Sequence, residues 1–202
     1  MDIETHPFEP WLPANAKLLM LGTFPPAPKR WAMEWYYPNF TNDMWRIMGI
    51  IFFNDKYHFV DKEHKTYKLN ELMPFLKEKG IALFDTALRI RRTTGTASDK
   101  DLEIIEEADL DAMLRALPEC KAVLTAGQLA TKIFSDHYHI DARNLKMGEF
   151  VDFSFENRKL KLYRQPSSSR AYPMKVEDKS AFYESMFKDC LLYTSPSPRD
   201  TR

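Results

Sequence analysis

KLLMLGTFPPAP, residues 17–28, is the stretch that decides the fold. Its first five residues form an apolar run typical of a strand buried on both faces, and Gly22 with the following prolines ends that run. Similar runs follow at residues 81–84, 122–125 and 160–163, and helical patterns lie at residues 43–51, 70–79, 109–117, 128–136 and 179–188. Strands that alternate with helices favour a parallel sheet. We predict a three-layer α/β/α sandwich around a central, mainly parallel four-stranded sheet.

The rest of the chain adds an edge to this sheet and a surface loop. Residues 149–155 alternate apolar and polar side chains, and residues 156–158 can turn them back into the last strand, which makes a hairpin edge plausible. The charged residues 54–68 are typical of a surface loop. With 202 residues, 44% of them hydrophobic, the chain has the size of one domain.

The composition changes abruptly at the C-terminal end. CLLYTSPSPRDTR, residues 190–202, resembles translated sequencing-adaptor sequence, and an ordinary disordered tail is the alternative. We therefore predict a single domain at residues 1–189, followed by a non-native tail at residues 190–202.

Several classes of protein are disfavoured. No apolar run approaches the roughly 18 to 20 residues that a membrane helix needs, and the acidic N-terminus is unlike a signal peptide, so we expect a cytoplasmic protein. Cys120 and Cys190 cannot hold a metal or an iron–sulfur cluster alone, and four of the histidines, His58, His64, His137 and His139, lack partners at metal-ligand spacing. We expect no metal and no cofactor.

Charge bears on nucleic-acid binding only through its distribution. The 29 Lys and Arg residues balance 29 Asp and Glu residues, so net charge gives no support. Residues 89–98, RIRRTTGTAS, concentrate arginines and hydroxyls that suit backbone phosphates, although such a run is often only a solvated surface.

Three further segments place polar and aromatic side chains at strand or helix ends, where open α/β sheets form their sites. GTFPPAP at residues 22–28 is a stiff turn, YYPNFTNDMWR at residues 36–46 runs from an aromatic loop into a helix, and YRQPSSSRAY at residues 163–172 follows the last strand. Read alone, these segments are also compatible with a structural turn, a helix cap at Asn42 and a serine turn.

Together, the second and third segments resemble two motifs of the uracil-DNA glycosylase superfamily. YYPNFTNDMWRIM is similar to the Asn-x-x-Trp segment of its mismatch-specific and deoxyinosine-acting bacterial branches, and QPSSS resembles its second motif, which presses into the DNA minor groove. The resemblance implies a monofunctional DNA repair glycosylase that hydrolyses the N-glycosidic bond of a flipped deaminated base, uracil or hypoxanthine, with water. Its partner is DNA that contains such a base, and we expect a monomer.

The resemblance and the chemistry of the side chains assign roles as follows: catalysis to Asn42 and Gln165; base binding to Gly22, Thr23, Phe24, Tyr37 and Asp85; DNA binding to Arg91, Arg92, Ser167, Ser168, Ser169 and Arg170. Core packing is the alternative for Phe24, and capping of the 93–98 loop is the alternative for Asp85.

The sequence departs from the superfamily at two positions. Many members have Asp or Asn in the first motif, where this chain has Thr-Phe-Pro, so positioning of the water passes to Asn42, as in the deoxyinosine-acting branch. Gln165 stands where the uracil-specific branch has His, which predicts modest turnover or another base preference.

Two rival classes of function remain. One is a non-catalytic nucleic-acid-binding relative. The other is a serine hydrolase that uses residues 167–169, but no Gly-x-Ser-x-Gly motif supports it.

Overall fold

The computed structural model describes residues 2–94 and 101–190. Its main sheet has five strands in the order β5-β2-β8-β10-β9. Four of them run parallel to one another: β2 (Leu18–Gly22), β5 (Ile81–Asp85), β8 (Ala122–Ala126) and β10 (Arg158–Gln165). β9 (Phe150–Phe155) pairs antiparallel with β10 as an edge hairpin. The four predicted parallel strands and the hairpin are confirmed, and the sheet is mixed, with five strands rather than four.

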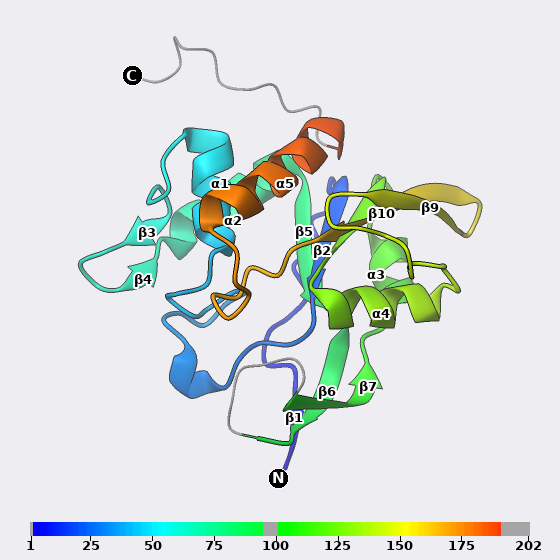
Figure 1. Ribbon diagram of the computed structural model, residues 1–202, viewed down its shortest axis with the longest axis horizontal. Helices are drawn as coiled ribbons and strands as arrows, with labels where there is room; N and C mark the ends of the chain where they lie inside the picture. Colours follow the sequence, from blue (N-terminus) through cyan, green and yellow to red (C-terminus); the bar gives the residue numbers. More distant parts are fainter. Residues whose placement is uncertain (1, 95–100, 191–202) are drawn as a thin grey trace.

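Helices cover both faces of this sheet. They are α1 (Met44–Phe53), α2 (Leu69–Lys79), α3 (Leu110–Ala116), α4 (Gln128–His137) and α5 (Val176–Cys190). In Figure 1, α1, α2 and α5 gather on one side, and α3 and α4 on the other. The strand order explains this division. The chain moves from β2 to β5 in one direction and then past β2 to β8 and β10 in the other, so right-handed crossovers place the connecting helices on opposite faces.

Two small sheets were not predicted. β1 (Ile3–Thr5), β6 (Ala87–Arg92) and β7 (Leu102–Glu107) form an antiparallel sheet in the order β1-β6-β7. The supposed surface loop at residues 54–68 contains the hairpin β3 (Val60–Asp61) and β4 (Thr66–Tyr67) and buries Phe59 against the core. Part of the arginine-rich segment at residues 89–98 is therefore a strand. Residues 95–98 of that segment lie outside the described residues.

The end of α5 bears on the predicted domain boundary. α5 continues through Cys190, whose side chain is buried, so the boundary drawn after residue 189 falls inside a helix. The rest of the predicted tail, residues 191–202, lies outside the described residues. Within the described ranges, no helix combines the length and the apolar character that crossing a bilayer requires.

Gly49 gives a test of how α1 packs. A Cβ built at this position would overlap the backbone carbonyl oxygen of Asp55, which follows the helix. Replacing glycine by alanine inside an open helix stabilises it by about 1 kcal/mol. Here we expect Gly49→Ala to destabilise the protein by about 1–3 kcal/mol because the backbone must move. Urea unfolding measures the difference, and a more stable variant would contradict this packing.

Candidate active site

A pocket opens at the carboxyl ends of the parallel strands, beside the point between β2 and β8 where the winding of the chain reverses direction. Open α/β sheets bind ligands at such a switch point because the connections diverge there. The cavity has a volume of about 110 Å³, well below the roughly 300–1,000 Å³ of sites for drug-sized ligands. The structure brings the following predicted site residues to its wall: Gly22, Thr23, Phe24, Tyr37, Asn42, Asp85, Ser167, Ser168 and Ser169.

Gly22 ends β2 at the floor of this pocket. A Cβ on Gly22 would lie 2.8 Å from Oδ1 of Asp85 and 3.8 Å from the hydroxyl oxygen of Tyr37. The backbone N–H and hydroxyl of Thr86 both donate to the carbonyl of Gly22, at 2.9 and 3.0 Å, and fix the turn. Glycine is therefore needed here to let a carboxylate and a hydroxyl approach the strand end.

The carboxylate of Asp85 has a buried partner that sequence reasoning missed. Nε2 of His6 lies 2.6 Å from Oδ2 of Asp85, and the His6 side chain is fully buried. Pairing of β1 with β6 brings His6 to this place, where its backbone N–H donates to Leu88. The contact spans 79 positions in the chain, so no local pattern reveals it.

Among the described residues, three aromatic side chains line the pocket: Phe24, Tyr36 and Tyr37. Tyr37 has a φ of 53°, a left-handed conformation that is uncommon for a bulky residue. Its buried hydroxyl has no hydrogen-bond partner among the described residues, and burial together with the nearby charge of Asp85 raises the pKa of Tyr37 well above its usual value. The hydroxyl therefore remains a proton donor. The ring of Phe24 meets His6 edge to face at 5.3 Å between centroids.

Asn42 lies at the start of α1, on the opposite wall. Its Oδ1 accepts a hydrogen bond from the backbone N–H of Met44 at 2.9 Å. The N-cap of α1 is Asp43, however, so the predicted cap at Asn42 is wrong, and this bond closes the turn that precedes the helix. The bond fixes the Asn42 side chain and leaves the amide NH2, and one lone pair of Oδ1, to meet a ligand.

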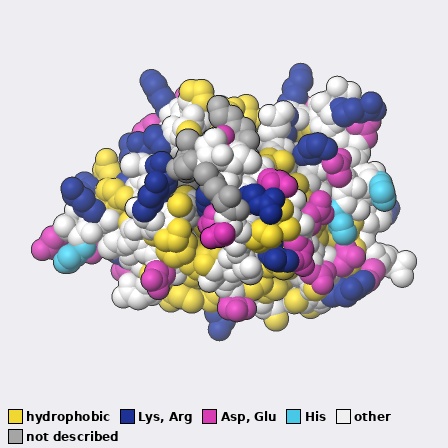
Figure 2. All heavy atoms as spheres, turned by 90° about the horizontal axis from the view of Figure 1, so that it is seen from below, with side chains coloured by type: hydrophobic (Ala, Val, Ile, Leu, Met, Phe, Trp, Pro, Cys, Tyr) yellow, Lys and Arg dark blue, Asp and Glu magenta, His cyan; other side chains and the backbone are white. Residues whose placement is uncertain are grey.

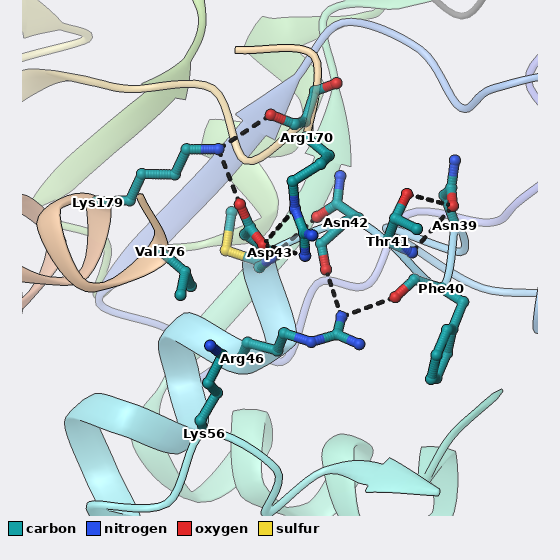
Figure 3. Close-up of polar contacts among 12 residues, drawn as sticks. Asn39, Phe40, Thr41, Asn42, Asp43, Arg46, Lys56, Arg170, Val176 and Lys179 are labelled. Carbon is teal, nitrogen blue, oxygen red and sulfur yellow. Dashed lines mark hydrogen bonds and ion pairs between the residues drawn. The ribbon is translucent and has the colours of Figure 1, made fainter. Parts of the chain in front are cut away.

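Asp43 holds the two loops of the pocket together (Figure 3). Its carboxylate is buried and accepts from the ammonium of Lys179 at 2.9 Å and from the guanidinium of Arg170 at 2.8 Å. Lys179, fully buried in α5, also donates to the carbonyl of Ser169, and the backbone N–H of Asp43 donates to Ser168, each at 2.9 Å. Sequence reasoning missed Asp43 and Lys179, since their side chains meet across 136 positions.

Gln165 does not reach the pocket. Its side chain is buried on the α5 side of β10, where Nε2 donates to the carbonyl of Phe182 at 3.3 Å. Tyr163 lies two positions earlier and therefore on the same face of β10. It interacts with Cys190 and Asp189 at the end of α5, so this face of the strand is the one that α5 covers. The pleat of β10 therefore turns Gln165 away from the predicted base position.

The arginines of β6 do not form a free basic patch. Arg91 pairs with Glu103 at 3.0 Å across the strand pair, and Arg92 pairs with Glu4 at 2.8 Å and donates to the carbonyl of Pro25. Arg92 thus supports the turn that carries Phe24. On the face toward which β1 and β6 extend, Figure 2 shows basic and acidic side chains interspersed with hydrophobic ones. Arg170, half exposed, is the predicted DNA-binding arginine that lies beside the pocket.

Among the described residues, no three His, Cys, Asp or Glu side chains are grouped so that they could hold a metal ion. The described wall of the pocket offers amides, hydroxyls, aromatic rings and the Asp85 carboxylate.

The fold of this chain has a solved counterpart. The chain is similar to the solution NMR structure of a protein described as a putative uracil DNA glycosylase from Methanosarcina acetivorans, with a TM-score of 0.63 and 20% sequence identity over 94% of this chain and 99% of the other. No family model and no curated protein matches the sequence. The likeness establishes the fold.

The buried ion cluster predicts a large effect on stability. Removing one partner of a buried ion pair leaves a charge without compensation and costs roughly 3–5 kcal/mol. We expect Lys179→Met to destabilise the protein by about that amount, measured by urea unfolding. The matched control is Lys188→Met in the same helix, because the ion pair of Lys188 with Glu184 is exposed and should contribute less than about 1 kcal/mol. Equal effects of the two substitutions would contradict the role given to Lys179.

Proposed function

We propose that this protein is a monofunctional DNA glycosylase that hydrolyses the N-glycosidic bond of uracil or hypoxanthine flipped out of DNA. The observation that carries the proposal is the convergence of Phe24, Tyr37, Asn42 and the serine loop on one small pocket at the switch point. A flipped base needs a snug cavity with an aromatic face and a few polar groups for its edge. The glycosylase-like fold supports the same reading.

The residues divide the chemistry among them. Phe24 offers a face for stacking, and the backbone amides of Thr23 and Phe24 follow the strand end, where they can donate to a base carbonyl that gains negative charge. Asn42 orients the attacking water through the lone pair of Oδ1 that Met44 does not use. A neutral amide can orient the water but cannot take its proton, which suits slow turnover.

In this proposal, the loop after β10, residues 166–170, contacts the DNA. Ser167 and Ser169 present short hydroxyls and backbone groups at the pocket, Ser168 lines it with a buried side chain, and Arg170 lies beside them. These groups suit phosphates and the gap left by a flipped base. Arg91 and Arg92 take part only indirectly, since acidic partners neutralise them. Gln165 supports the loop from the α5 side.

Substitution of Asn42 tests this assignment. We expect Asn42→Ala to lower the single-turnover cleavage rate of uracil- and hypoxanthine-containing DNA by about 100-fold or more, because the water loses its orienting group. Gln165→Ala should lower the rate by less than about 10-fold, since its amide contacts Phe182. Asn15→Ala, an exposed asparagine bonded to Lys77, is the control and should leave the rate unchanged.

Equal rates for the wild type and Asn42→Ala would remove Asn42 from catalysis. Tight binding of the modified DNA without cleavage of either base would favour the non-catalytic relative instead.

A further inference from the structure

The backbone carbonyls of Asn39, Phe40 and Asn42, in the loop before α1, converge on two side chains. The hydroxyl oxygen of Tyr67 lies 2.9, 2.8 and 3.1 Å from these three carbonyl oxygens, in chain order. Nη1 of Arg46 donates to the carbonyl of Phe40 at 2.7 Å and to that of Asn42 at 3.0 Å, as Figure 3 shows. It also donates to the hydroxyl of Tyr67 at 3.0 Å. We call Tyr67 and Arg46 the carbonyl clamp.

The clamp supplies the protons that converging carbonyls need. Carbonyl dipoles that point at one place repel one another, and a hydroxyl can donate one proton while Nη1 can donate two. Both clamp side chains are buried, and burial raises the pKa of Tyr67, so its hydroxyl remains a donor. The guanidinium carbon of Arg46 also lies 5.0 Å from the ring centroid of Phe40 and 5.8 Å from that of Tyr67. Carbonyls and ring faces thus surround a buried cation.

The clamp restrains Asn42 in particular. The backbone N–H of Asn42 donates to the carbonyl of Asn39 at 2.9 Å, and its own carbonyl accepts from the clamp. Its side-chain Oδ1 accepts from the N–H of Met44. Backbone and side chain are therefore both held, and the amide NH2 stands at the pocket wall in one orientation.

Tyr67 reaches this loop from the β3–β4 hairpin. The hairpin is tied to its surroundings by the backbone N–H of Lys68, which donates to the carbonyl of Phe59 at 2.8 Å, and by the hydroxyl of Thr66, which donates to the carbonyl of Ala32 at 2.6 Å. Neither clamp residue lies in the described wall of the pocket. The clamp therefore acts on a ligand only through the loop that it holds.

We propose that Tyr67 and Arg46 are positioning residues that fix Asn42, so that its side chain meets the attacking water in a productive orientation. This inference rests on the proposed function, because it explains how the water-orienting group of that site is held. A preset group need not be ordered during the reaction, and a displacement of about 1 Å can lower a rate about 100-fold. Because the clamp does not line the pocket, it acts on the rate of cleavage more than on the affinity for DNA.

Tyr67→Phe tests the clamp, since it removes the hydroxyl and keeps the ring. We expect the single-turnover rate on the modified DNA that the wild type cleaves to fall about 10- to 100-fold at saturating protein, with the Kd for that DNA changed by less than about 3-fold. Arg46→Lys should keep more of the rate than Arg46→Met, because an ammonium can still donate to the carbonyls. Tyr138→Phe is the matched control, because its hydroxyl donates to Asp111 at 2.8 Å, and it should leave the rate unchanged.

A double substitution separates positioning from a general weakening of the fold. If Tyr67 acts through Asn42, adding Tyr67→Phe to Asn42→Ala should slow cleavage no further, because residues that act as a unit are not additive. A generally weakened fold would lose the same factor in both backgrounds.

The side-chain amide signals of Asn42 in NMR spectra of the labelled protein give a second readout that needs no cleavage. Tyr67→Phe should shift or broaden these signals, because the loop that carries Asn42 loses one of its donors. Tyr138→Phe should leave them in place.

The outcomes separate this inference from the proposed function. Cleavage by the wild type together with an unchanged rate in Tyr67→Phe, an equal loss in both backgrounds or unmoved Asn42 signals would overturn the inference and leave the glycosylase intact. No cleavage of either base by the wild type, together with Asn42 signals that move in Tyr67→Phe, would sink the proposed activity and keep the role of the clamp in holding Asn42.

Discussion

The position of the site is determined by the strand order, because the direction in which the chain adds strands to the sheet reverses at β2. β2 is the first strand of the main sheet, and the chain places its next parallel strand on one side of it and the two after that on the other. Right-handed crossovers then send the connections to opposite faces, so the loops after β2, β5 and β8 separate at their carboxyl ends. This separation leaves room for a pocket at the carboxyl ends of the strands, and the side chains that line the pocket determine its chemistry.

The buried carboxylate of Asp43 converts this gap into a defined site. It joins the start of α1, which carries Asn42, to the serine loop and to Lys179 of α5. A single buried charge is costly, but the two cations Arg170 and Lys179 compensate it. The outer partner, Arg170, is half exposed, whereas Lys179 is fully enclosed, so the cluster keeps a neutralising charge even where Arg170 turns toward another ligand.

The sequence predicts the strands of the main sheet well, but it does not predict the buried side chains that hold the site residues in place. The reasons are physical. The runs at residues 17–21, 81–84 and 122–125 are recognisable because they contain β2, β5 and β8, which are buried at every residue and so must be apolar. The run at residues 160–163 is less uniform, since Lys161 of β10 is only partly buried. β6 was not predicted as a strand, because its arginines pair with the acidic side chains of β7 and with Glu4. In the sequence, such a strand resembles a charged, solvent-exposed segment. His6 and Lys179 carry no local signal at all, since their partners lie far away in the chain.

The charge of Asp85 works against the proposed chemistry. A departing base gains negative charge, and a carboxylate about 6 Å away at an effective dielectric constant of about 20 disfavours that charge by about 3 kcal/mol. In the proposed reaction, Asp85 therefore hinders departure of the base. The donors that follow Gly22, the Tyr37 hydroxyl and the His6 hydrogen bond to Asp85 act in the other direction. With a neutral Asn42 in place of an acid and a carboxylate at the floor of the pocket, we expect the proposed reaction to be slow.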